Sequence, residues 1–135
     1  MTVQNVTEYY PTSADKIYLA GPMSGIEGYN LKGFNMFAKH LREQGLDIVN
    51  PAELAVDDGT VAGSHPWEYY VKYDLKFLLE CNSMILIPGW RDSRGVRLEL
   101  TIAATLKYKV YLIGEDFRLK MFEEDGFFAV PYTSR

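Results

Sequence analysis

The stretch that decides the fold is "SMILIPGWRDSRGVRLELTIAATLKYKVYLIG", residues 83–114. Its first seven residues begin with an apolar run and close on a Pro-Gly pair, which is typical of a buried strand. Residues 94–108 carry apolar side chains at i, i+4 spacing, which predicts a helix, and a second apolar run occupies residues 109–114. Strand, helix and strand in this order favour a parallel sheet covered by helices.

The segments before and after this stretch extend the same alternation. We predict strands at 16–21 and 46–51, helices at 31–45 and 67–82, a glycine-rich loop at 22–30 and a mostly irregular segment at 52–65. In the tail, residues 118–125 are predicted as helix, and residues 126–132 as a fifth strand or an apolar arm. The strands are continuous apolar runs, so we expect one α/β domain with a doubly wound parallel sheet of about five strands, of the flavodoxin or Rossmann type.

Composition narrows the classes of function. The chain has 135 residues, which suits a single domain, and its net charge of −4 provides no general positive field for duplex nucleic acid. Cys81 is the only cysteine, which excludes an internal disulfide, and His40 and His65 are far apart in sequence. We therefore expect no metal site and no cofactor. The sequence shows no signal-peptide pattern and no apolar run of membrane-spanning length, so the cytosol is the expected location.

The turn between residues 83–89 and 94–108 is rich in groups that bind anions. Ser93 supplies a hydroxyl, Gly95 lets the backbone approach a ligand closely, and the helix start offers unpaired N–H groups. Three arginines crowd the same turn: Arg91, Arg94 and Arg97. One or two of them are expected to add a charge-assisted bond. The alternative is structural, with Ser93 as a helix cap and the arginines as a solvated surface.

Two carboxylates and a glycine-rich loop are expected near this turn. Glu99 lies about one turn into the helix, and its side chain should lean back toward the helix start. Asp74 lies in the preceding helix. Each has an ordinary alternative, as an exposed helical glutamate and as an aspartate paired with a neighbouring lysine. Ligands of parallel sheets bind outside the carboxyl ends of the strands, where the loop at 21–30 also lies.

The chain resembles the nucleoside 2-deoxyribosyltransferase-like superfamily in four ordered segments: "IYLAGPMSG", "FNMFAKHLREQGLDIVNP", "YDLKFLLECNSMILIPGW" and "SRGVRLELTIAATLKYKVYLI". The similarity covers residues 16–113 and is greatest to a small phage-type stand-alone branch. The chain is also similar to 2′-deoxynucleoside 5′-monophosphate N-hydrolases. The similarity implies one domain of this superfamily at residues 16–135, preceded by an N-terminal arm at 1–15.

The resemblance implies roles for individual positions. Glu99 matches the nucleophile that attacks C1′ of the deoxyribosyl group, and Asp74 matches the acid that assists departure of the base. The positions expected to bind substrate are Tyr18, Gly21, Ser24, Gly25, Ser93, Gly95, Arg91 and Arg94. The chemistry would be that of glycosidases, in which two carboxylates flank a developing oxocarbenium ion. One stays ionised to stabilise or trap this ion, and the other transfers a proton.

Ser93 bears on the substrate. Superfamily transferases that act on free nucleosides tend to carry an aspartate six residues before the nucleophile, whereas 5′-monophosphate hydrolases carry a serine that binds the phosphate. Ser93 occupies this position, so the resemblance implies an N-glycosidase acting on a 2′-deoxynucleoside 5′-monophosphate. A transferase acting on free nucleosides and a non-catalytic nucleotide-binding module remain the alternatives.

The resemblance also bears on partners and on the base. The expected partner is a small nucleotide or nucleoside, with no nucleic-acid polymer and no membrane. Active sites of the superfamily are often completed by a neighbouring subunit, so a homodimer or larger homo-oligomer is expected. Three further side chains could reach a base pocket: His65, Trp67 and Tyr70. The alternatives are an incidental loop histidine and aromatic side chains of the core or of an interface.

Overall fold

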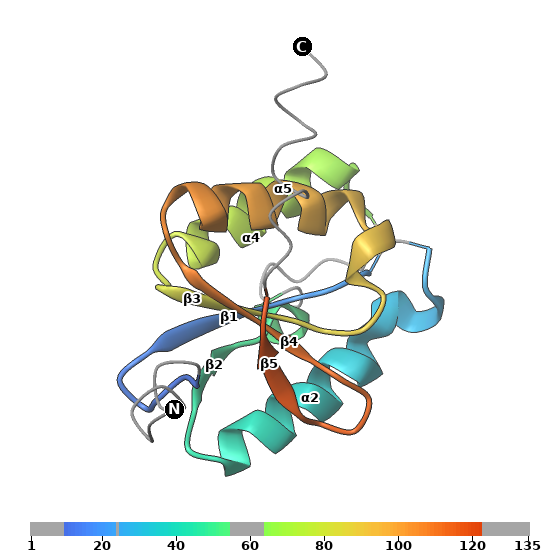
Figure 1. Ribbon diagram of the computed structural model, residues 1–135. Helices are drawn as coiled ribbons and strands as arrows, with labels where there is room; N and C mark the ends of the chain where they lie inside the picture. The colour runs from blue at the N-terminus through green and yellow to red at the C-terminus, as the bar shows by residue number, and fades with distance from the viewer. Residues whose placement is uncertain (1–9, 24, 55–63, 123–135) are drawn as a thin grey trace.

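The computed structural model describes residues 10–23, 25–54 and 64–122 (Figure 1). The elements in chain order are β1 (Lys16–Ala20), η1 (Glu27–Asn30), α2 (Leu31–Glu43), β2 (Asp47–Val49), α3 (Pro51–Leu54), α4 (Trp67–Leu78), β3 (Ser83–Leu86), η2 (Trp90–Asp92), α5 (Arg94–Thr105), β4 (Lys109–Ile113) and β5 (Leu119–Met121). The predicted strands and helices up to β4 are confirmed, with their ends shifted by a few residues.

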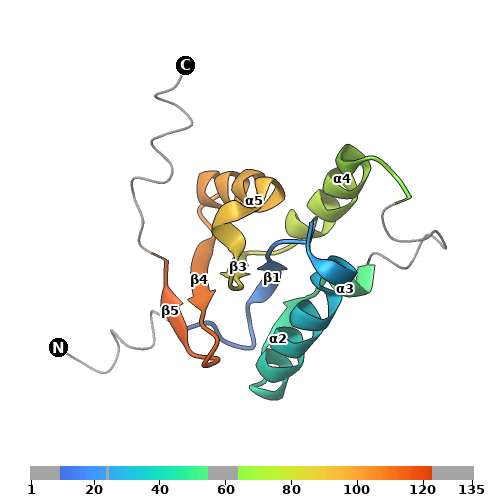
Figure 2. The same ribbon diagram turned by 90° about the vertical axis from the view of Figure 1, so that its right-hand side faces the viewer.

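The strands form one sheet in the order β2-β1-β3-β4-β5. Neighbours among the first four strands run parallel, and β5 pairs antiparallel with β4. Helices α4 and α5 cover one face of the sheet and α2 covers the other, as Figures 1 and 2 both show. The doubly wound α/β fold is therefore confirmed. This strand order places the topological switch point between β1 and β3, where ligands of such sheets bind.

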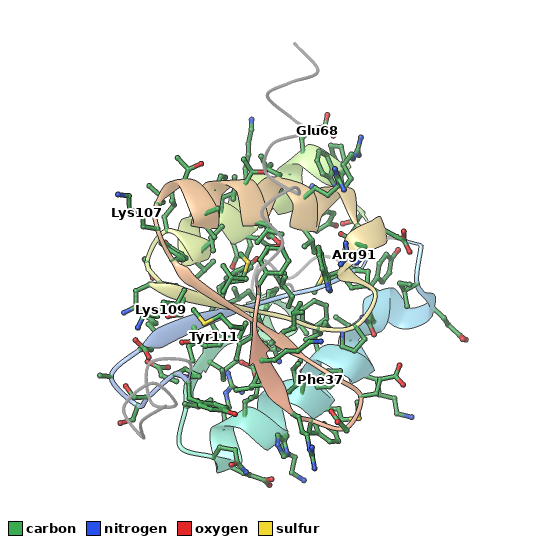
Figure 3. All side chains as sticks on the ribbon, in the orientation of Figure 1. Phe37, Glu68, Arg91, Lys107, Lys109 and Tyr111 are labelled. Atoms are coloured by element: carbon green, nitrogen blue, oxygen red, sulfur yellow. The ribbon has the colours of Figure 1, made fainter. Side chains whose placement is uncertain are left out.

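The central strands are buried on both faces, which explains their uninterrupted apolar runs. Ile17 and Leu19 of β1 pack in the core on the α2 side, together with Phe37 and Tyr111, which Figure 3 labels. Successive side chains of a strand point to opposite faces. The next residue in β1, Tyr18, therefore belongs to the second core, beneath α4 and α5. This alternation directs the Tyr18 hydroxyl toward the face on which Glu99 and Asp74 lie.

Two local predictions were wrong or incomplete. Residues 118–125 were expected to be helical, but Leu119–Met121 form β5, whose backbone groups pair with those of β4. The segment 52–65 begins as helix α3, since the buried side chain of Asn50 accepts a hydrogen bond from the N–H of Ala52 at 3.0 Å. The strand or arm expected at 126–132 lies outside the described residues.

Candidate active site

A cavity of about 600 Å³ lies at the carboxyl edge of the sheet, next to the ends of β1 and β3. Its lining comes from the loop after β1, from α4 and the residues before it, and from the turn leading into α5. The lining residues are Gly21, Met23, Tyr29, Leu31, His65, Trp67, Tyr70, Val71, Asp74, Asp92, Ser93, Arg94, Gly95, Val96 and Glu99. The structure therefore brings both predicted carboxylates and the predicted anion-binding turn to one cavity.

Glu99 is a buried residue of the cavity lining. It extends from α5 toward the sheet and is only 8% exposed. The hydroxyl of Tyr18, a residue 1% exposed on β1, donates a hydrogen bond of 2.8 Å to Glu99 Oε2. Burial raises the pKa of Glu99 to about 8; the negative charge of Asp74 adds to this rise, and the bond from Tyr18 opposes it. The exposed helical glutamate of the alternative interpretation is excluded.

Asp74 contributes the second carboxyl group. It lies on α4 and lines the cavity, and burial raises its pKa to about 7. Near neutral pH this pair can therefore hold one proton and one negative charge together, and the higher pKa of Glu99 places that proton on Glu99 when no substrate is bound. Catalytic pairs that need an acid and an anion in one site have this property.

The two raised pKa values predict how stability depends on pH. Both groups bind protons more tightly in the folded chain than in the unfolded one, where carboxyl pKa values are about 4. The stability they contribute is complete below about pH 4 and is lost as pH rises through about 7 and about 8. We expect the free energy of unfolding to fall between about pH 5 and pH 9, and to fall less in Glu99→Gln. Urea denaturation across this range measures the difference, and equal slopes for the two proteins would contradict it.

The position of Ser93 is compatible with both roles considered for it, as a helix cap and as a residue that binds a ligand. Its Oγ accepts a hydrogen bond of 3.2 Å from the N–H of Val96, so it is the N-cap of α5. Because a capping oxygen acts as an acceptor, the hydroxyl proton can still be donated to a ligand in the cavity that Ser93 lines. At Gly95, a Cβ would meet no atom nearer than 3.9 Å, so packing does not require glycine there.

The three arginines of the turn are separated by the structure. Arg94 lines the cavity, and its guanidinium carbon lies 3.6 Å from the centroid of the Trp67 ring. Arg91, labelled in Figure 3, lies 4.5 Å over Trp90 and lines a different cavity, formed with the ends of β4 and β5. Arg97 is exposed on α5 and lines neither cavity.

Of the other positions that were predicted to bind substrate, only some line the cavity. Gly21 lines it, and a Cβ there would collide with the side chain of Ile87. Gly25 is not among the lining residues, Tyr18 reaches the site through Glu99, and Ser24 lies outside the described residues.

The three aromatic candidates of α4 and its preceding loop all line the cavity. Two of them share a cluster, because the His65 ring stacks on Tyr69 at 3.8 Å and lies edge-on to Tyr70 at 5.8 Å. Sequence reasoning missed Asp92, although it precedes Ser93 directly in the turn that was singled out.

Two findings concern the parts of the chain that the structure describes. Their His, Cys, Asp and Glu side chains form no group of three that could hold a metal ion. None of their helices is both long and apolar enough to cross a membrane.

Comparison with known proteins assigns the family. The family described as "Domain of unknown function (DUF4406)" matches residues 15–112, most of the chain. The chain belongs to this family. No curated protein matches this DUF4406 member.

Two solved enzyme structures match the chain to different degrees. A 2-deoxyribosyltransferase from Bacillus psychrosaccharolyticus, described as a biocatalyst for nucleoside synthesis, is 27% identical with a TM-score of 0.56, and the match covers 73% of this chain and 72% of that one. The CMP N-glycosidase BcmB from Clostridium botulinum is 21% identical with a TM-score of 0.43, covering 76% and 74%. The match to the transferase shows that this member of DUF4406 has a deoxyribosyltransferase-like fold.

Proposed function

We propose that this protein is an N-glycosidase that cleaves the base–sugar bond of a 2′-deoxynucleoside 5′-monophosphate, with Glu99 as nucleophile. The observation that carries the proposal is the position of Glu99 and Asp74 in one cavity with the N-terminus of α5. The 27% identity to a 2-deoxyribosyltransferase over most of both chains supports chemistry at the glycosidic carbon.

Substrate binding is proposed to reverse the order of the two pKa values, so that the proton passes from Glu99 to Asp74. In the proposed first step, the Glu99 carboxylate attacks C1′ while Asp74 gives its proton to the departing base. The C1′–N bond breaks, its electron pair leaves with the base, and an ester forms between Glu99 and the sugar. Burial makes the Glu99 anion costly, so the positive charge that develops at C1′ stabilises it. The hydrogen bond from Tyr18 holds Oε2 of the carboxylate, so the attack is assigned to Oε1.

In the second step, water attacks C1′ of the ester. Asp74, now ionised, takes a proton from the water, and the C–O bond to Glu99 breaks. The products are the free base and deoxyribose 5-phosphate, and both carboxyl groups return to their starting protonation. This is the two-carboxylate sequence of retaining glycosidases.

The 5′-phosphate is placed at the start of α5. The residues at this helix start, Ser93, Arg94 and Gly95, line the cavity. A helix N-terminus favours negative charge, and a guanidinium suits phosphate oxygens. Of the three arginines in the turn, the proposal retains Arg94.

Exchanging Ser93 tests the substrate. The parent protein should prefer a 5′-monophosphate to its nucleoside by about ten- to a hundredfold or more in kcat/KM, since charge-assisted hydrogen bonds contribute about 1.5–3 kcal/mol each. Ser93→Asp should narrow or invert this preference by placing a negative charge beside the phosphate. Ser93→Asn is the matched control. All three side chains can cap α5, so folding is retained while only the charge differs. Base release from paired nucleotides and nucleosides is measured by chromatography.

Competition with phosphate completes this experiment. Inorganic phosphate, or a monophosphate that cannot be cleaved, should inhibit the parent protein and Ser93→Asn but spare Ser93→Asp. Equal turnover of nucleoside and nucleotide by the parent, without inhibition by phosphate, would contradict the monophosphate proposal.

One observation favours a second candidate, a 2-deoxyribosyltransferase acting on free nucleosides. Asp92 lines the cavity next to Ser93, where its carboxylate would repel a phosphate dianion and could accept a bond from a sugar hydroxyl. The two candidates share the ester at Glu99 and differ in what attacks it. Adding a second free base should produce a new nucleoside if the transferase is correct, whereas the N-glycosidase releases the sugar to water.

We also propose that the protein is a homodimer, with the helix at 67–80 or the C-terminal tail at the contact. Tyr69 on α4 is 36% exposed and Leu79, just beyond it, is 59% exposed, so apolar surface is available there. Light scattering at micromolar concentration should give twice the monomer mass. If the helix forms the contact, Leu79→Glu should shift the mass toward the monomer. A monomer mass for the parent protein would contradict the proposal.

A further inference from the structure

We infer that Trp67 is a positioning residue that holds the Arg94 guanidinium at the phosphate end of the cavity, and thereby sets how strongly monophosphates are preferred over nucleosides. The inference rests on the proposed function, because it concerns recognition at the same site. Trp67 is the first residue of α4 and Arg94 the first residue of α5. The two helix starts therefore meet at the cavity that both side chains line.

The contact between them is close. The guanidinium carbon of Arg94 lies 3.6 Å from the centre of the Trp67 ring. The ring nitrogen, Nε1, lies 4.0 Å from the position that a Cβ would occupy at Gly95. Trp67 therefore contacts Arg94 while its edge borders the turn that is proposed to receive the phosphate.

An arginine at this position needs something to hold it. Positive charge at a helix N-terminus is disfavoured by the helix dipole, and Arg94 is exposed, with a long side chain that loses entropy when it is fixed. The indole ring attracts the cation and limits its directions. A stacked guanidinium is held by its flat face, so its N–H donors, which lie in the plane, stay available to phosphate oxygens. A carboxylate partner would instead occupy those donors.

The same turn contains a matched pair that does not reach the cavity. Arg91 lies over Trp90 at 4.5 Å, but Trp90 is 7% exposed and both residues line the cavity beside β4 and β5. Loss of the Arg91 charge changes the net charge as much as loss of the Arg94 charge does. Arg91→Ala therefore separates a local contact with the phosphate from a general electrostatic effect.

The test compares kcat/KM for a monophosphate with kcat/KM for its nucleoside in each variant. Because both substrates contain the same sugar and base, any effect of a variant on recognition of these two parts cancels in the ratio. Arg94→Ala should lower the ratio about tenfold or more. Trp67→Leu should lower it about two- to fivefold, through KM for the monophosphate, and Trp67→Phe should restore most of the loss. In the Arg94→Ala background, Trp67→Leu should change the ratio no further. Arg91→Ala should leave it unchanged.

Several results would overturn the inference. An equal loss for nucleotide and nucleoside in Trp67→Leu would assign Trp67 to packing of the cavity. A further fall of the ratio in the double variant would show that Trp67 acts independently of Arg94. Monophosphate binding is also measured by titration calorimetry, which needs no turnover. If the parent protein releases no base, the proposed function fails, but a loss of monophosphate affinity in Trp67→Leu that is absent in the Arg94→Ala background still supports the inference.

Discussion

Glu99→Gln is expected to abolish base release, lowering kcat by several orders of magnitude while leaving nucleotide binding in place. A carboxamide has nearly the shape of the carboxylate and can still accept the hydrogen bond from Tyr18, but it is not a nucleophile toward C1′. The substitution also removes a buried ionisable group, so the variant should fold as well as the parent. Base release is followed by chromatography in single-turnover experiments, and binding is followed by calorimetry.

A control for this variant is available on the opposite face of the sheet. Glu43 ends α2 and is exposed, so Glu43→Gln makes the same chemical change away from the cavity and should retain full activity. Activity of Glu99→Gln within a few-fold of the parent would exclude Glu99 as the nucleophile. Trapping of a deoxyribosyl ester on the parent protein, detected by mass spectrometry and absent in the variant, would support the role directly.

Asp74→Asn should lower the rate by about 10²–10⁴-fold for substrates with a poor leaving base, the usual contribution of a positioned acid. Asparagine keeps the size of the side chain but has no carboxyl proton to give. With its pKa raised to about 7, Asp74 is still partly protonated at neutral pH and can act as this acid. The loss should be much smaller for a base that departs readily as an anion, because that base needs no proton in the transition state.

The dependence on the leaving base is the diagnostic result. It is measured as the ratio of single-turnover rates, parent over Asp74→Asn, across substrates that differ only in the acidity of the released base. A ratio that is the same for every base would show that Asp74 shapes the cavity or its charge without donating a proton. Melting temperatures of both proteins control for loss of folded enzyme.

The sequence alone determined those features of the fold that depend on local physics. Apolar runs without alternation predicted strands buried on both faces, and the helical spacing of Phe34, Phe37 and Leu41 predicted α2. Gly45, at φ 88°, follows α2 in the left-handed conformation expected of a residue that ends a helix. The N-terminal end of α5 was also predictable, because a serine before a helical run caps the N–H groups of its first turn.

The prediction of a helix at residues 118–125 was wrong because pairing with a neighbouring strand determines the structure there. Residues 119–121 have a composition compatible with a helix, but they lie beside the exposed edge of β4, and an edge strand offers a row of unpaired groups. Hydrogen bonds to β4 therefore outweigh a weak helical preference. Only five residues, 114–118, separate the partner strand β4 from β5, and Gly114 lies in this connecting segment, so the sequence did carry a hairpin signal. The segment was misassigned because its composition was weighed without this neighbouring strand.

The tertiary structure alone decided which candidate side chains share a site. Nothing in the sequence distinguished Arg91 from Arg94. In the structure, Arg94 lines the cavity with Glu99, whereas Arg91 lines the cavity beside β4 and β5. The bond from Tyr18 to Glu99 joins residues 81 positions apart. The pKa values of Glu99 and Asp74 rise because helices and sheet exclude water around them. Helix periods, caps and apolar runs act between neighbours in the chain, whereas desolvation and the meeting of distant side chains arise only when the sheet and its helices pack together.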